Sequence, residues 1–166
     1  MTTTADNLAT AFAGESQANR KYLAFAQKAE KEGFTSIARL FRAAAEAETI
    51  HALAHFNNLG GVGATIDNLK TAVAGETYEY TKMYPPMLEQ AIAEGHKAKT
   101  MFGFALKAEE VHAKLYAAAL KAIESGQDLD GAEIYLCPFC GDIEIGKPTA
   151  KCPICGAAAE KYRRID

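Results

Sequence analysis

Apolar residues recur every three or four positions through most of the first 125 residues, which is the spacing at which an α-helix presents one face to a core. The pattern predicts four helices, near residues 5–31, 34–58, 66–93 and 96–124. Gly33, a glycine-rich segment at 57–63 and Gly95 separate them. Pro85-Pro86 falls inside the third helix and should kink or break it after Tyr84, because proline lacks the backbone N–H and clashes with the preceding turn.

An internal repeat with a constant offset of 61 residues divides these helices into two similar pairs. Ala13-Gly14-Glu15 corresponds to Ala74-Gly75-Glu76, and Phe41 corresponds to Phe102. Each half should form a helical hairpin. We therefore expect a mainly α fold in which two hairpins make a four-helix bundle, joined by a connection at 57–66 that crosses the bundle.

The helix face that should be buried carries acids where a core normally has methyl groups. A Glu-x-x-His element occurs once in each half, with a lone glutamate on the preceding helix: Glu48 and His51 after Glu15, and Glu109 and His112 after Glu76. Residues three apart share a helix face, so four carboxylates and two imidazoles would point inward, which suits a pair of iron ions, or of manganese ions. The alternative is surface glutamates with two incidental histidines. Agreement with the repeat favours the metal site, and a metal would offset the cost of burying the carboxylates.

Glu79 breaks the symmetry of the repeat, because the corresponding residue of the first half is Ala18. Three residues after Glu76, it would offer one iron an extra oxygen ligand in competition with a histidine, and ferric iron prefers the carboxylate. The alternative is a solvated surface glutamate. Tyr22 and Tyr84 lie about two turns beyond the lone glutamates, where they would donate hydrogen bonds to ligand carboxylates or fill the core.

All four cysteines lie in the last 30 positions, in two C-P-x-C-G knuckles: Cys137, Cys140, Cys152 and Cys155. Such knuckles aim backbone N–H groups at the sulfurs and leave four thiolates around one tetrahedral metal. Zinc and iron both fit, and the redox-active metal pair expected elsewhere in the chain favours iron. The segment is too short for a core of its own, so it needs the metal.

Composition narrows the possible functions. A net charge of -3 and a pI near 5.8 leave no electrostatic footprint for nucleic acid or for an anionic membrane surface. The first residues contain neither a basic nor an apolar targeting region, no long apolar run is present, and clustered cysteines are unlike a secreted disulfide framework. We expect a cytoplasmic protein that binds neither nucleic acid nor membrane.

Together these motifs resemble the rubrerythrin family, in which a ferritin-like di-iron domain precedes a rubredoxin-like domain. The resemblance covers nearly the whole chain, including residues 11–16, 75–80 and 83–85 and both knuckles. We expect a ferritin-like four-helix bundle at 1–126, a linker at 127–136, and a rubredoxin-like four-cysteine iron domain at 137–166. The loop at 142–151 lacks an aromatic residue usual in rubredoxins, and the domain is shorter than free rubredoxin.

The resemblance also implies roles for the ligands. Glu48 and Glu109 would bridge the irons, Glu15 and His51 would serve one iron with Glu79 added on oxidation, and Glu76 and His112 would serve the other. From their positions beside the ligands, we also expect a catalytic contribution from Glu79, Tyr22 and Tyr84.

Family members reduce hydrogen peroxide to water with electrons passed through the four-cysteine iron. The resemblance therefore implies an oxidoreductase of the NADH peroxidase type, supplied by rubredoxin or by an NAD(P)H-linked reductase. One alternative is a ferritin-like ferroxidase, which needs neither Glu79 nor an electron-transfer domain. Another is a zinc-stabilised binding module, which leaves the inward acids unexplained.

The length of the linker bears on the assembly. Ten linker residues reach at most about 35 Å, so folding back along the bundle of the same chain should require a nearly taut linker. A head-to-tail homodimer would instead place each four-cysteine domain over its partner's di-iron site. The resemblance points the same way, and it also allows an exchange of helices between the subunits.

Overall fold

The computed structural model describes residues 2–129 and 131–166. Residue 1 of the expected bundle domain and residue 130 of the expected linker lie outside the described residues. The chain divides into two compact units, Met1–Gly63 and Ala64–Asp166. In the described part of the chain, no helix is both long enough and apolar enough to cross a membrane.

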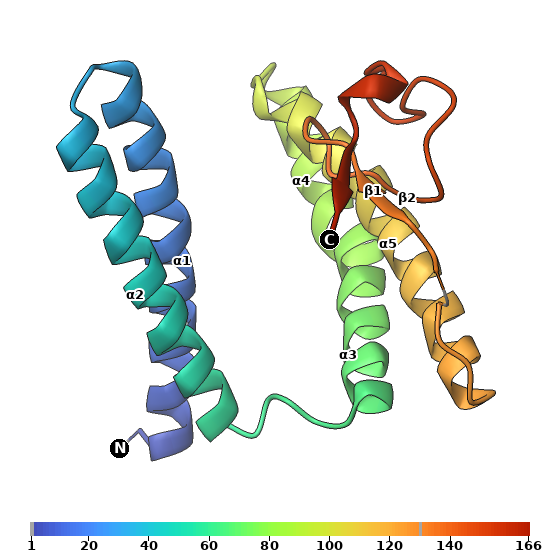
Figure 1. Ribbon diagram of the computed structural model, residues 1–166, viewed down its shortest axis with the longest axis horizontal. Helices are drawn as coiled ribbons and strands as arrows, with labels where there is room; N and C mark the ends of the chain where they lie inside the picture. Colours follow the sequence, from blue (N-terminus) through green and yellow to red (C-terminus); the bar gives the residue numbers. More distant parts are fainter. Residues whose placement is uncertain (1, 130) are drawn as a thin grey trace. The chain divides into compact units, whose positions relative to one another are not determined.

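The first unit is a helical hairpin of α1 (Thr4–Lys31) and α2 (Thr35–Asn58), which lie side by side (Figure 1). A capping box between Thr3 and Asp6 starts α1. The buried residues of both helices are alanines, whose small side chains let the two backbones approach closely. Asn19 ties the helices together, because its amide donates to the Ala45 carbonyl at 2.7 Å and to the Thr49 hydroxyl at 2.8 Å.

The helices of the second unit are α3 (Thr65–Tyr78), the π-helix η1 (Glu79–Met83), α4 (Tyr84–Ala93) and α5 (Ala98–Glu124). The first three of these helices, α3, η1 and α4, all pack against α5. The predicted helix bounds agree with these to within two residues, but the predicted kink or break after Tyr84 is wrong. The irregularity precedes Tyr84 as the π-helix. The two prolines lie in the first turn of α4, where a missing N–H costs nothing.

A three-stranded antiparallel sheet completes the second unit, with β1 (Ile134–Leu136) between β2 (Ile143–Ile145) and β3 (Arg163–Ile165). A short 3-10 helix, Ala159–Lys161, precedes β3. The last three residues of the expected linker thus form a strand.

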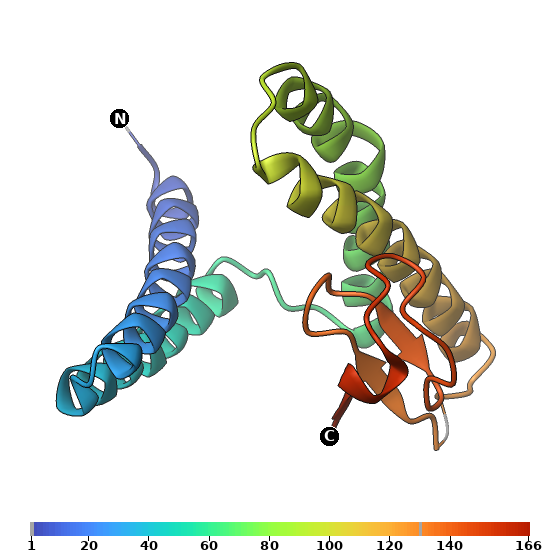
Figure 2. The same ribbon diagram turned by 90° about the horizontal axis from the view of Figure 1, so that it is seen from above.

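The sheet and its knuckles fold back along α5 of the same chain (Figures 1 and 2). Phe104 of α5 packs against the cluster formed by the cysteines and Tyr162. This corrects the expectation that folding back needs a nearly taut linker, because the chain reverses at Ser125 and Gly126 and runs antiparallel to the helix it has just left. The predicted fold class, mainly α with a small C-terminal metal-knuckle domain, is confirmed.

Candidate metal centres

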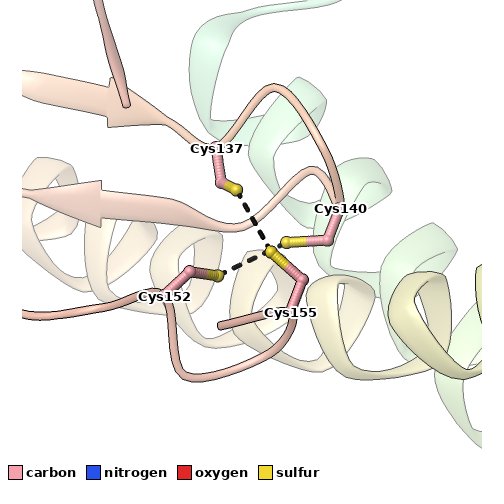
Figure 3. Close-up of side chains that lie close together, drawn as sticks. All are labelled: Cys137, Cys140, Cys152 and Cys155. Atoms are coloured by element: carbon pink, nitrogen blue, oxygen red, sulfur yellow. Dashed lines mark hydrogen bonds between the residues drawn. The ribbon is translucent and has the colours of Figure 1, made fainter. Parts of the chain in front are cut away.

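The four cysteine sulfurs converge from the two knuckles (Figure 3). The Sγ atoms of Cys137 and Cys155 lie 3.6 Å apart, and those of Cys140 and Cys152 lie 3.5 Å apart. A tetrahedral metal with bonds of about 2.3 Å holds its sulfurs about 3.8 Å apart, so the residues fit one metal ion. Burial raises the pKa of the Cys140 thiol, and a cation would offset the penalty of a buried thiolate there.

Both knuckles turn on a glycine in the left-handed region. Gly141 has φ 87° and Gly156 has φ 77°. The N–H of Gly141 donates to the Cys137 carbonyl at 3.0 Å, and the N–H of Gly156 donates to the Cys152 carbonyl at 2.9 Å. Any side chain would strain these turns. The local sequence C-P-x-C-G therefore fixes the direction of the sulfurs.

The first carboxylate–histidine group lies on the α1–α2 hairpin and brings together Glu15, Glu48 and His51. The Nδ1 atom of His51 is 3.4 Å from Glu48 Oε2 and 4.0 Å from Glu15 Oε2. The hydrogen bond shared with Glu48, and then burial, raise the pKa of Glu15. A cation between the two carboxylates would offset their mutual repulsion. The His51 side chain is 55% exposed, so this group lies at the surface of its unit.

The second group lies between α3 and α5 and brings together Glu76, Glu109 and His112. The Nδ1 atom of His112 is 2.6 Å from Glu109 Oε2 and 3.7 Å from Glu76 Oε2. Burial, and then the neighbouring Glu109, raise the pKa of Glu76. These three side chains are 22% exposed or less, so the group is more enclosed than its counterpart.

A hydrogen bond joins this second group to the four-cysteine group. The Nε2 atom of His112 lies 2.8 Å from the carbonyl oxygen of Gly141, which directly follows Cys140. A carbonyl can only accept, so Nε2 donates, and Nδ1 is the ring nitrogen that faces the carboxylates. The ring is therefore oriented as a metal ligand through Nδ1. Sequence reasoning missed this bond, whose partners are 29 residues apart.

Glu79 is the first residue of the π-helix, one turn beyond Glu76. Burial, and then the charge of Glu76, raise the pKa of Glu79. Burial, and then the charges of Glu109, Glu79 and Glu76, raise the pKa of the Tyr84 phenol. The carboxylate charges of the second group therefore act on both side chains.

Tyr22 in the first unit lies within an aromatic cluster, with ring centroids 6.3 Å from Phe25 and 6.2 Å from Phe41. The π-helix explains why it corresponds to Tyr84. Tyr22 follows Glu15 by seven residues, whereas Tyr84 follows Glu76 by eight. The wider turn absorbs the extra residue, so that both tyrosines stand about two turns from their glutamates.

These donor groups are typical of a metalloprotein with two kinds of metal site. Two groups of carboxylates and imidazoles offer hard oxygen and nitrogen donors, and one group of four thiolates offers soft donors. The first kind suits iron or manganese, and the second suits iron or zinc. Iron therefore fits both kinds of group.

Comparison with known proteins gives the family. The family model for rubrerythrin matches residues 6–120. Rubrerythrin-2 of Clostridium acetobutylicum is 39% identical over 175 residues, which cover 96% of this chain and 95% of that protein. Nigerythrin of Nitratidesulfovibrio vulgaris is 41% identical over 167 residues, which cover 92% of this chain and 81% of that protein. The chain belongs to the rubrerythrin family, which confirms the resemblance found in its sequence.

Solved structures of nigerythrin share the fold. Partially reduced nigerythrin matches with a TM-score of 0.58 and 35% identity, over 99% of this chain and 88% of that chain. Fully reduced, all-ferrous nigerythrin matches with a TM-score of 0.57 and 37% identity, over the same shares. Family membership and the donor sets together support iron binding by this chain.

Proposed function

We propose that this chain is a non-haem di-iron peroxidase, which reduces hydrogen peroxide to water with electrons delivered through a four-cysteine iron. The observation that carries the proposal is the hydrogen bond from His112 to the Gly141 carbonyl. It connects a ligand of the carboxylate–histidine site to the residue after Cys140 by a few covalent bonds and one contact of 2.8 Å. A ferroxidase that stores iron needs no such connection.

We further propose that the two carboxylate–histidine groups meet in one di-iron site, in which Glu48 and Glu109 bridge the metals. The surface of α2 supports this association. Ile37 and Leu40 lie on the same helical face as Glu48 and His51, and they are 48% and 69% exposed. Burying this apolar face against a second hairpin would stabilise the bundle and exclude water from the ligands.

The second hairpin belongs either to the same chain or to the partner in a homodimer. Complementation distinguishes these arrangements. A chain carrying Glu48→Ala is damaged only in Met1–Gly63, and a chain carrying Glu109→Ala is damaged only in Ala64–Asp166. Mixed dimers of the two should contain one intact site if helices are exchanged, and none if each chain pairs its own hairpins.

When bound, the iron pair supplies the two electrons that cleave the O–O bond of peroxide. The reaction also consumes two protons and yields two waters. Tyr84 keeps its phenolic proton, because burial and the nearby carboxylates raise its pKa. It is therefore a hydrogen-bond donor toward the ligand carboxylates or the substrate, and Glu79 offers a further carboxylate beside Glu76.

Electrons would enter at the four-cysteine site from rubredoxin or from an NAD(P)H-linked reductase, as in an NADH peroxidase system. Stopped-flow mixing of the fully reduced, iron-loaded protein with hydrogen peroxide tests the proposal. The visible absorption of ferric tetrathiolate iron should rise with kinetics coupled to peroxide loss. Excess ferrous iron oxidised by oxygen in preference to peroxide, with the four-cysteine iron left reduced, would indicate a ferroxidase instead.

A further inference from the structure

A buried carboxylate lies beside the four-cysteine site, and the proposed reaction gives it no part. Asp142 directly follows the first knuckle and is 1% exposed. It is the one buried charged residue among the described residues. Its Oδ2 atom lies 3.6 Å from Cys152 Sγ and 2.6 Å from the hydroxyl oxygen of Tyr162.

Tyr162 is the donor in this pair. Its phenol hydroxyl has one hydrogen to donate, and a carboxylate oxygen accepts it. That single hydrogen goes to Asp142 at 2.6 Å in preference to Glu144 Oε1 at 3.2 Å. A length of about 2.5–2.7 Å is typical of a hydroxyl that donates to an ionised carboxylate. Asp142 is therefore a buried carboxylate held in place by Tyr162.

The pair also acts on Cys152. In the metal-bound site the Cys152 thiolate has no hydrogen to donate. Asp142 then faces a thiolate at close range, and the Tyr162 hydroxyl is the dipole that moderates their repulsion.

We propose that Asp142 and Tyr162 are positioning residues that set the reduction potential of the four-cysteine iron, which Asp142 lowers and Tyr162 raises. The inference rests on the proposed presence of iron at this site. Reduction adds one negative charge to a centre that already carries four thiolates. A carboxylate in a water-poor site opposes that added charge, whereas a hydroxyl that donates to this carboxylate offsets part of its negative charge and so favours reduction.

Glu144 provides a matched control. It contacts the same Tyr162 hydroxyl but is only partly buried, so water and salt screen its charge. Replacing Glu144 by Gln removes the same charge as replacing Asp142 by Asn. The location of the charge is the main difference between the two variants.

The experiment is a redox titration of the full iron-loaded chain at neutral pH, in which ferric tetrathiolate absorption reports the oxidised fraction. Asp142→Asn should raise the ratio of reduced to oxidised iron at a fixed potential by at least tenfold, which is about 59 mV for one electron. Tyr162→Phe should lower that ratio severalfold, and Glu144→Gln should change it less than twofold. An unchanged ratio for Asp142→Asn, or a shift of Tyr162→Phe in the same direction as Asp142→Asn, would overturn the proposal.

Iron content and the ferric spectrum show whether each variant assembles the site. If Asp142→Asn fails to bind iron, the Tyr162→Phe variant alone tests the proposal. An unchanged or raised ratio of reduced to oxidised iron in Tyr162→Phe would then overturn it. Iron can also be loaded into the refolded protein in vitro. A chain that carries zinc when isolated from iron-replete cells would therefore count against the proposed function, while potentials measured after iron loading still test Asp142 and Tyr162.

Discussion

Glu79 is the residue that most clearly separates the second hairpin from the first, where Ala18 corresponds to it. The raised pKa of Glu79 comes from burial and from the charge of Glu76, so the two carboxylates share one environment. Glu79→Ala should keep both irons of the pair but lower the ratio of the peroxide rate to the oxygen rate by about tenfold, because one iron loses the carboxylate that favours its ferric state. Stopped-flow mixing with each oxidant measures it.

The matched control for Glu79 is Glu110→Ala. Glu110 pairs with Lys114 on α5 at 2.6 Å, and its side chain is 44% exposed. The Glu110→Ala variant should leave the ratio of the peroxide rate to the oxygen rate unchanged. If Glu79→Ala behaves in the same way, Glu79 has no redox role.

The two knuckle glycines allow the contact with His112 to be tested. Alanine at Gly141 or at Gly156 should strain a left-handed turn by about 1–2 kcal/mol, and the melting temperatures of the two variants should fall by similar amounts. Gly141→Ala should also displace the carbonyl that accepts from His112 and slow oxidation of the four-cysteine iron after peroxide mixing. Equal rates in Gly141→Ala and Gly156→Ala would argue that the His112 contact does not carry electrons.

At the scale of elements, the π-helix Glu79–Met83 sets the register between Glu76 and Tyr84. Deleting Tyr80 should convert it to an ordinary α-helical turn and leave Tyr84 seven residues after Glu76, which is the spacing of Tyr22 from Glu15, so Tyr84 should keep its place beside the carboxylates. The deletion should therefore slow the peroxide reaction less than Tyr84→Phe does. Iron analysis provides the control, because Glu76, Glu109 and His112 should still bind metal. A deletion variant that is slowed as much as Tyr84→Phe, with normal iron content, would show that the π-helix does more than absorb the extra residue.

The elements also mark what the sequence could reveal. Periodicity located the helix ends, because it reports a buried face and its glycine boundaries. The proline rule identified the irregular region of the third helix but not its form. The extra residue between Glu76 and Tyr84, compared with Glu15 and Tyr22, was the available signal for the π-helix.

The sequence alone could not predict contacts between residues that are far apart in the chain. The knuckles were predictable because each is local, but Asp142 and Tyr162 are 20 residues apart and their pairing depends on how β3 joins the sheet. The linker length gave only a maximum reach. It did not give the direction in which the four-cysteine domain turns along α5.

For the whole molecule, metal content is the most direct expectation. Protein from iron-replete cells should hold three irons per chain, because the carboxylate–histidine and cysteine ligand sets share no residue. Glu48→Ala combined with Glu109→Ala should remove two irons and leave the four-cysteine iron with its visible spectrum. Elemental analysis per chain measures this, and a single metal in fresh wild-type protein would contradict the di-iron site.

The stability of the metal-free protein should depend on pH, and metal binding should reverse that dependence. The pKa values of Glu76 and Glu79 are raised in the metal-free fold, so the folded chain holds these protons more tightly than the unfolded chain. Glu76 and Glu79 stabilise the fold fully below the ordinary glutamate pKa of about 4.3. This stabilisation is lost as the pH rises through their higher pKa values in the folded state. The melting temperature of the metal-free protein should therefore fall as pH rises across this window, and the fall should be smaller in Glu76→Gln with Glu79→Gln. An identical slope in that variant would remove these residues as the cause.

The route of electrons is the last property of the whole molecule. The Gly141 carbonyl and His112 belong to one compact unit, Ala64–Asp166, so transfer from the four-cysteine iron should stay within that unit of a single chain. The linker length favoured the opposite arrangement, a head-to-tail homodimer in which electrons cross between the subunits. Mixed dimers pairing a Cys137→Ser, Cys140→Ser chain with a Glu109→Ala chain should therefore be nearly inactive with a donor that enters at the four-cysteine iron. Mixed dimers of the cysteine variant with wild type should keep close to half of the activity and serve as the control. Activity near that control in the first mixture, with correct metal content, would show that electrons cross between chains.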